Sequence, residues 1–302
     1  DDLWIADGTG GLLVAENGSN PTALPAVLRA GSTINEVVFA FGHAVGRADV
    51  RGLAVLNRDG TDRLIDIGLR VRGLARSSSA LVAQGDDGFA ILNTADLDGA
   101  SAVTQTPVED LRAVAAAGEW IFAAAGDEIL VFGIDGTLQG MLTTSPELSG
   151  LEAHMIDNTL FVAAYDSGAG IQVFSGPSAL DLTEVLRDTS ATSAVGPAAL
   201  GLLISSPLGS VREVTRDGDV SQRFSFNDVV RDLLELDGVL IAASRDGVLA
   251  WAAGMDAPVR TGPRGFLESL AIEDERLALA AVENGVFVIE TSTIGNAVAA
   301  AR

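Results

Sequence analysis

The chain has 302 residues, of which 48% are hydrophobic and 20% are charged, a composition typical of a folded globular protein. Its formal net charge of −22 argues against nucleic acid as a partner, because a strongly acidic surface repels polyanions. The absence of cysteine excludes disulfides and thiolate metal sites, and no run approaches the roughly 18 apolar residues of a membrane span, so we expect no direct membrane insertion.

Short apolar runs recur along the whole chain. The first and last runs start 274 residues apart, which over seven intervals is about 39 residues per unit. A second apolar run follows each first run, and the residue before it is glycine in every unit except one, where it is Glu128. Glycine allows the positive φ of a tight hairpin, so the pattern predicts antiparallel strand pairs. The first runs start at Leu3, Val37, Leu81, Ile121, Leu160, Leu202, Val239 and Leu277.

Further short strands are expected on both sides of these hairpins. Those before the hairpins start at Val71, Val108, Gly150, Val229 and Phe266. Those after the hairpins start at Asp62, Leu182 and Val220. Four strands in about 39 residues is the sequence form of a β-propeller blade. No segment has a sustained apolar period of about 3.6 residues, which argues against a helical layer.

We therefore predict an all-β fold, a β-propeller of eight blades with four antiparallel strands each, formed by a single domain of residues 1–302. The first unit lacks one strand, and Thr291 to Arg302 is the remaining unassigned segment. Pairing of the N- and C-terminal strands in one blade would close the ring and remove an open sheet edge. Seven blades is the alternative, if the irregular unit from Val37 to Ile67, with its long turn GHAVGRADVRG, is an insertion.

The segment from Ala6 to Val27 carries a family resemblance. An Asp-Gly turn precedes an apolar strand, and an Asn20-Pro21 step follows it. In this first blade the chain resembles the LVIVD-type repeat of bacterial β-propeller proteins, although later units lack the Asn-Pro step. The resemblance implies an extracytoplasmic location, which covers periplasmic, secreted and surface-associated proteins.

Acidic residues recur in the turns between the second and third strands of the units. In a propeller these turns share one face, so their carboxylates would gather there. Such a ring could hold calcium, which prefers six to eight oxygen ligands. The alternative is that aspartate beside glycine simply makes turns. The candidate metal ligands are Asp7, Asp49, Asp86, Asp87, Asp127, Asp166 and Asp246.

A second candidate set lies at the start of the expected innermost strands, and it mixes guanidinium groups with carboxylates. These residues would face the mouth of the central channel, where they could grip a small anionic or zwitterionic ligand. The alternative is mutual salt bridging that plugs the channel. The set consists of Arg72, Arg112, Glu152, His154, Arg231 and Glu268.

No nucleophile elbow, phosphate-binding loop or histidine-rich metal site is present. We therefore predict a non-catalytic binding or scaffold propeller with a protein partner or a larger assembly, no assigned catalytic residue and no obligatory cofactor. The alternative is a calcium-dependent hydrolase of the phosphoesterase or lactonase class that uses the turn carboxylates.

Overall fold

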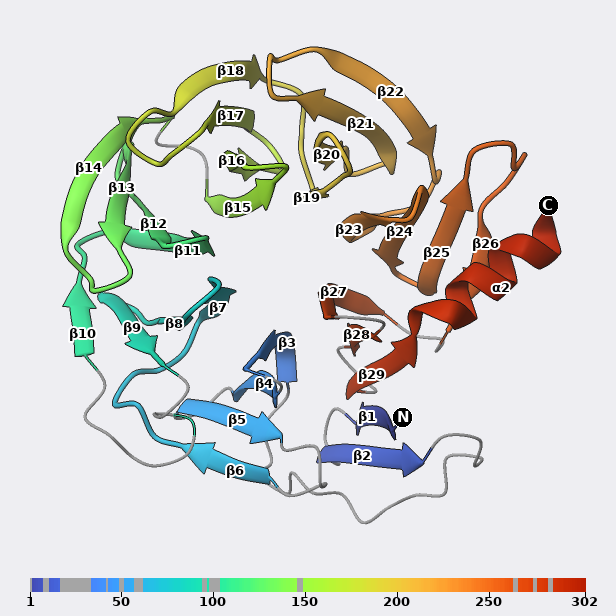
Figure 1. The fold of residues 1–302 in the computed structure, drawn as a ribbon, viewed down its shortest axis with the longest axis horizontal. Coiled ribbons are helices and arrows are strands. Elements are labelled where there is room, and N and C mark those ends of the chain that lie inside the picture. The colour runs from blue at the N-terminus through green and yellow to red at the C-terminus, as the bar shows by residue number, and fades with distance from the viewer. Residues whose placement is uncertain are drawn as a thin grey trace.

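The structure is a computed structural model. It describes residues 2–7, 11–16, 34–41, 43–48, 52–56, 62–93, 97, 104–145, 149–262, 266–273, 276–281 and 285–302. Its strands form six four-stranded sheets and one five-stranded sheet, and every strand pairing among the described residues is antiparallel. Figure 1 shows these sheets arranged as blades around a common axis, with one strand of each sheet nearest the centre. The predicted all-β propeller is confirmed.

In each four-stranded sheet the chain starts at the innermost strand and moves outward. The first four-stranded sheet contains β3 (Ile34–Ala40), β4 (His43–Ala48), β5 (Gly52–Leu56) and β6 (Asp62–Ile65). The second contains β7 (Gly73–Arg76), β8 (Leu81–Gln84), β9 (Gly88–Leu92) and β10 (Thr104–Pro107). The third contains β11 (Leu111–Ala117), β12 (Trp120–Ala125), β13 (Glu128–Gly133) and β14 (Leu138–Thr143).

The same order continues around the ring. The fourth sheet contains β15 (Gly150–Ile156), β16 (Thr159–Asp166), β17 (Gly170–Gly176) and β18 (Thr183–Asp188). The fifth contains β19 (Ala194–Pro197), β20 (Gly201–Ser205), β21 (Ser210–Thr215) and β22 (Val220–Ser225). The sixth contains β23 (Val230–Leu236), β24 (Val239–Ser244), β25 (Gly247–Ala252) and β26 (Val259–Thr261).

The five-stranded sheet joins the two ends of the chain. Its inner part consists of β27 (Leu267–Glu273), β28 (Arg276–Ala281) and β29 (Gly285–Glu290). Its outer part is the N-terminal hairpin of β1 (Asp2–Asp7) and β2 (Gly11–Glu16). β1 pairs with β29, with Ile5 opposite Phe287, so the predicted closure by strands from both ends is confirmed.

The predicted blade number is wrong. Neither eight nor seven uniform blades are found, because six sheets have four strands and the remaining sheet has five. The run at Leu3 forms the outer hairpin of that sheet and not a blade of its own. Part of the supposed long turn after Val37 is strand β4, so the Val37 run is an innermost strand. An apolar run predicts a strand, but its place within a sheet is set by tertiary pairing.

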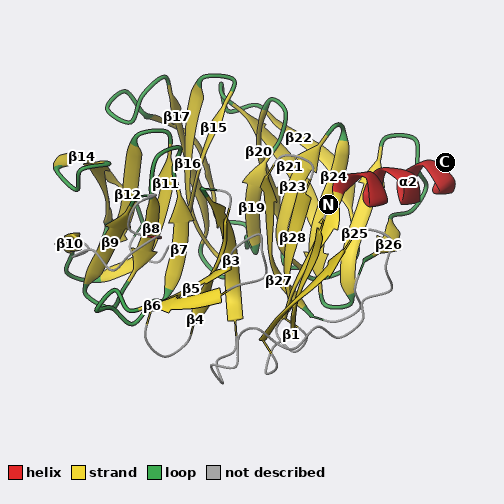
Figure 2. Cartoon of the chain, turned by 60° about the horizontal axis from the view of Figure 1, so that its bottom comes forward, coloured by secondary structure: helices red, strands yellow, loops and turns green. Residues whose placement is uncertain are grey.

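The prediction for the C-terminal segment is also wrong. This segment forms helix α2 (Thr291–Ala301) and not a strand. Ile294 and Val298 are one helical turn apart and both are buried in a hydrophobic cluster with residues of β24, β25 and β28. Figure 2 shows α2 at one side of the strands, and no helix of the described residues is long and apolar enough to cross a membrane.

The hydrophobic core lies between neighbouring blades. Phe89 of the second sheet packs edge-on against Phe132 of the third, with ring centroids 5.1 Å apart. Every residue of β8 is buried, because second strands are covered on both faces. This packing fixes the innermost strands around the axis, and these strands carry the candidate site.

Candidate functional site

A cavity of about 510 Å³ lies among the innermost strands. Its wall includes the third residue of all seven innermost strands, namely Ala75 of β7 and six others. Three of the six carry carboxylates and three are small, so the small residues leave space that the acidic residues face. The six residues are Glu36, Ala113, Glu152, Gly196, Asp232 and Ser269.

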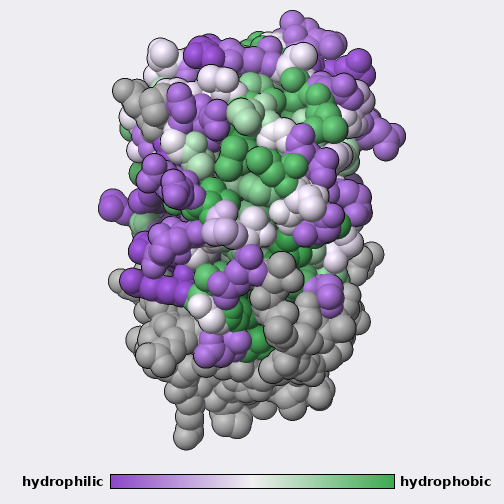
Figure 3. All heavy atoms as spheres, turned by 90° about the vertical axis from the view of Figure 1, so that its left-hand side faces the viewer, coloured by the Kyte–Doolittle hydropathy of each residue, from purple (hydrophilic) through white to green (hydrophobic). Residues whose placement is uncertain are grey.

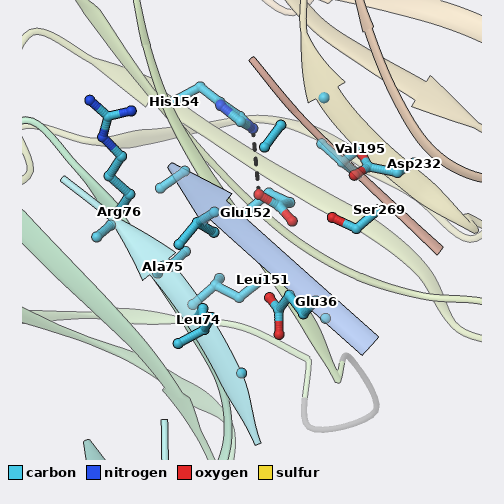
Figure 4. Close-up of a pocket in the computed structure, with 18 of the residues that line it drawn as sticks. Glu36, Leu74, Ala75, Arg76, Leu151, Glu152, His154, Val195, Asp232 and Ser269 are labelled. Carbon is cyan, nitrogen blue, oxygen red and sulfur yellow. Dashed lines mark ion pairs between the residues drawn. The ribbon is translucent and has the colours of Figure 1, made fainter. Parts of the chain in front are cut away.

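The local backbone explains two of these positions. Gly196 has no side chain because a Cβ there would lie 1.7 Å from the carbonyl oxygen of Leu233 on the adjacent innermost strand. Asp232 is held in place by the backbone N–H groups of Leu233 and Leu270, which donate to its carboxylate at 2.8 and 2.7 Å. Asp232 therefore connects β23 to β27 and presents a fixed carboxylate at the cavity wall (Figure 4).

The carboxylates of Glu36 and Asp232 are buried among other acidic groups. Burial raises the pKa of Glu36 from 4.5 to about 7, although a hydrogen bond from Leu74 and the charge of Arg47 oppose this shift. Burial raises the pKa of Asp232 from 3.8 to about 8, and the charge of Glu152 adds to the effect. Both groups therefore hold protons more tightly than exposed carboxyl groups do.

His154 and Glu152 occupy the same strand and face the cavity together. The Nε2 atom of His154 lies 3.5 Å from the Oε2 atom of Glu152, as the dashed line in Figure 4 marks. The residues are two apart, so strand geometry places them on the same side of β15. Their pairing keeps one carboxylate of the cavity beside an imidazole.

Tyr165 of β16 also lines the cavity and its mouth. Its ring lies against Gly150, where an added Cβ would come within 2.8 Å of the Tyr165 Cζ atom. Burial raises the pKa of the Tyr165 hydroxyl well above 10, with the charges of neighbouring carboxylates adding to it. Among the described residues, no hydrogen-bond partner of this hydroxyl is found.

The guanidinium groups at the mouth are engaged with other protein groups. Arg72 pairs with Asp86 of the β8–β9 turn. Arg47 donates from Nη1 to the Arg72 carbonyl oxygen at 2.6 Å. The Cζ atom of Arg231 lies 5.2 Å from the ring centroid of Phe266, which is a cation–π contact.

The structure brings together most of the channel residues chosen from the sequence. Arg72, Glu152, Arg231 and Glu268 surround a mouth cavity of about 240 Å³, and His154 lines the larger cavity below it. Arg112 lines neither cavity, and it donates from Nη2 to the carbonyl oxygen of Gly126. Binding of an anionic or zwitterionic ligand by these residues stays a prediction.

The turn aspartates have structural roles where the structure describes them. The carbonyl oxygens of three of them accept hydrogen bonds from a backbone N–H that comes one to four residues after the fourth strand, at 2.8 to 3.2 Å. The pKa of Asp166 is lowered because its carboxylate accepts hydrogen bonds from Ser149 and Gly168. Asp246 lies 3.7 Å from Arg260. The three carbonyl acceptors are those of Asp87, Asp127 and Asp166.

The predicted calcium site stays a prediction. Within the described ranges, no group of three or more histidine, aspartate or glutamate side chains is placed to hold a metal ion. Asp7 is the last residue of β1, and Asp49 lies outside the described residues. The contacts of Asp86 and Asp166 agree with the turn interpretation of these residues.

Sequence reasoning missed Glu36, Tyr165 and Arg47 as cavity residues. Glu36 directly precedes the apolar run at Val37. The repeat pattern assigned this run to the second strand of a blade. Alignment of that run with the innermost strands would have placed Glu36 level with Glu152. For Tyr165 no sequence signal was available, because a second-strand side chain reaches the cavity only where Gly150 makes room.

Comparison with known proteins shows the fold. No family model and no curated protein matches the chain. The RRP9 WD40 repeats are 12% identical with a TM-score of 0.66, and the match covers 96% of this chain and 97% of that one. BamB from Moraxella catarrhalis is 15% identical with a TM-score of 0.66, and 95% of each chain is covered.

A designed protein gives a similar result. The computationally designed Ika8 protein is 17% identical with a TM-score of 0.64, and the match covers 87% of this chain and 85% of that one. These structures support the propeller repeat architecture. At such low identities they assign no activity, and the LVIVD resemblance of the first blade stays a prediction.

Proposed function

We propose that this chain, as a single propeller domain of residues 1–302, is a non-catalytic binding or scaffold protein that contacts a partner protein through the face carrying its second-to-third strand turns. We call this face the turn face. Its likeness to the WD40 propeller structures supports a binding role.

The proposal rests on backbone hydrogen bonds that hold the second-to-third strand turns in place. In four blades, a residue that comes one to four positions after the fourth strand donates its backbone N–H to a carbonyl oxygen in or beside the second-to-third strand turn, at 2.8 to 3.2 Å. Such turns lose little conformational entropy when a partner binds, so they form a preorganised surface. The donor residues are Val108, Thr144, Thr192 and Phe226.

Side chains on the turn face indicate the chemistry of the partner. Asp127 and Asp246 are exposed there, and Leu208, in the β20–β21 turn, is 80% exposed. An apolar side chain among carboxylates suits a partner with a basic surface around an apolar pocket. The net charge of −22 would steer such a partner toward this protein.

A second exposed surface lies on the side of the ring. Figure 3 shows hydrophobic residues between more polar regions on that side of the molecule. Leu138 and Met141 of the edge strand β14 are 54% and 58% exposed. Sheet edges with apolar side chains are sites of association, so this side needs its own control.

The test is affinity capture from the source organism, followed by binding measurements with the identified partner. The double variant Leu208→Asp with Asp127→Lys alters the turn face. Leu200→Asp alters the opposite face, where Leu200 is 67% exposed, and Met141→Asp alters the side. We expect the turn-face variant alone to bind at least about tenfold more weakly, since a central apolar anchor is worth more than about 1.4 kcal/mol.

Equal binding by the turn-face variant would refute the choice of face. Calcium-dependent turnover of phosphoesters or lactones by the purified protein would refute the non-catalytic proposal in favour of the hydrolase. The proposed extracytoplasmic location is tested separately, by fractionation of the source cells.

A further inference from the structure

We propose that the central cavity binds a small aliphatic amine with two or more ammonium groups, held by Glu36, Glu152 and Asp232 and by the hydroxyl of Tyr165. This site lies inside the ring and is separate from the protein-binding turn face.

The first argument is the charge of the cavity wall. In the described part of the chain, no guanidinium group forms an ion pair with Glu36, Glu152 or Asp232. The arginines at the mouth contact Asp86, a backbone carbonyl and an aromatic ring, and of these arginines Arg47 acts on Glu36 through its charge alone. A carboxylate removed from water is stabilised by an opposite charge, and a bound cation would supply it.

The second argument is the Tyr165 hydroxyl. This group lines both the cavity and its mouth, where it is half-buried, and no protein group of the described residues bonds to it. The phenol oxygen is open to the cavity and can accept a hydrogen bond from a bound ligand. An ammonium N–H could donate to its oxygen.

The spacing of the carboxylates favours an organic cation over a metal ion. The three carboxylates come from β3, β15 and β23, which lie at different places around the ring (Figure 1). They are not grouped closely enough to hold one metal ion. A cavity of about 510 Å³ is of the size that small molecules occupy. A ligand that extends across the cavity with a charge near each end can meet carboxylates on separate strands.

Small residues in the wall leave room for a ligand between the carboxylates. Ala113, Gly196 and Ser269 stand where bulkier side chains would fill the space between the carboxylates. Figure 4 shows Glu36, Glu152, Asp232 and Ser269 around the same open region. Aliphatic carbons of the ligand would contact Leu74, Ala75 and Leu151, which also line the cavity.

Isothermal titration calorimetry with three ligands of one carbon chain length tests the proposal. The probes are 1,5-diaminopentane, the neutral pentane-1,5-diol and the dianion glutarate, and magnesium chloride is titrated separately. We expect the diamine to bind and the other three to show no saturable heat. Binding of the diol or glutarate as tightly as the diamine, or no diamine binding at millimolar concentrations, would overturn the proposal. Preferential binding of magnesium would also overturn it.

Variants locate the binding site. Glu152→Gln keeps the shape of the side chain and removes its charge, and it should weaken diamine binding by about tenfold or more. Tyr165→Phe removes only the hydroxyl and should weaken binding by about threefold or more. The control is Asp217→Asn, which removes one exposed charge remote from the cavity. Each variant is first shown to melt cooperatively, and equal affinity of folded Glu152→Gln and Tyr165→Phe with wild type would refute the site.

Discussion

The substitution Glu36→Gln should make the protein more stable at alkaline pH and leave its stability nearly unchanged at acidic pH. The pKa of Glu36 is about 7 in the folded protein, against 4.5 as the ordinary value. The folded state therefore binds this proton more tightly than the unfolded state. As a result, the contribution of Glu36 to stability falls as the pH rises from about 4.5 to about 7.

The size of the effect follows from the shift. A difference of about 2.5 pKa units, at 1.36 kcal/mol per unit, corresponds to about 3 kcal/mol that the charged carboxylate costs above its folded pKa. The glutamine is neutral at every pH and its Oε1 atom can still accept the hydrogen bond from Leu74. The variant should therefore gain up to about 3 kcal/mol over wild type between about pH 4.5 and pH 8.

Urea denaturation at several pH values measures this difference. The matched control is Asp217→Asn, because it also removes one negative charge from a chain of net charge −22, but at a side chain that is 78% exposed. The control corrects for the general relief of charge repulsion. A stability difference between Glu36→Gln and wild type that is constant with pH, or equal to that of the control, would show that the carboxylate is not buried as described.

Three further predictions concern the fold and the turns. Gly170→Ala should lower the free energy of unfolding by more than about 2 kcal/mol, because φ is +99° and the new Cβ would lie 2.1 Å from the Asp188 carbonyl oxygen. Gly126→Ala, with φ of +57° and no atom within 4 Å, should cost only about 1 kcal/mol in the same urea titration. Ile294→Ala should cost about 2–4 kcal/mol, because this residue of α2 is 2% exposed; an unchanged melting temperature would show that the helix does not pack on the blades. Millimolar calcium should leave the melting temperature unchanged, since carboxylates such as Asp166 already have protein partners; a clear rise would instead support the calcium site.

The sequence predicted the regular part of the ring well. Gly150 begins the strand expected there, and the second strands starting near Leu81, Ile121, Leu160, Leu202 and Val239 are all found. These strands are buried on both faces, so their apolar runs are continuous and easy to recognise. The assignment of the run at Val37 to a second strand was wrong. An innermost strand that faces a cavity cannot be told from a second strand by its composition.

The ends of the chain show a different limit. Whether the hairpin at Leu3 is a blade or the outer part of another blade depends on its pairing with β29, some 280 residues away in sequence. The Thr291 segment was expected to pair in that sheet, but β1 occupies the edge of β29. Its alanines and the spacing of Ile294 and Val298 then favour a helix that covers apolar side chains.

The fold itself does not require carboxylates at the cavity wall, since Ala113 and Gly196 occupy the same level of their strands. Burial of charged groups without guanidinium partners lowers stability, and apolar residues of similar volume would avoid that loss. The raised pKa values of Glu36 and Asp232 are the signature of this loss. Binding of a cation would lower the free energy of these buried carboxylates more than that of any exposed group. The residues that lower the stability of the free protein are therefore the ones that would make the cavity selective for a positively charged ligand.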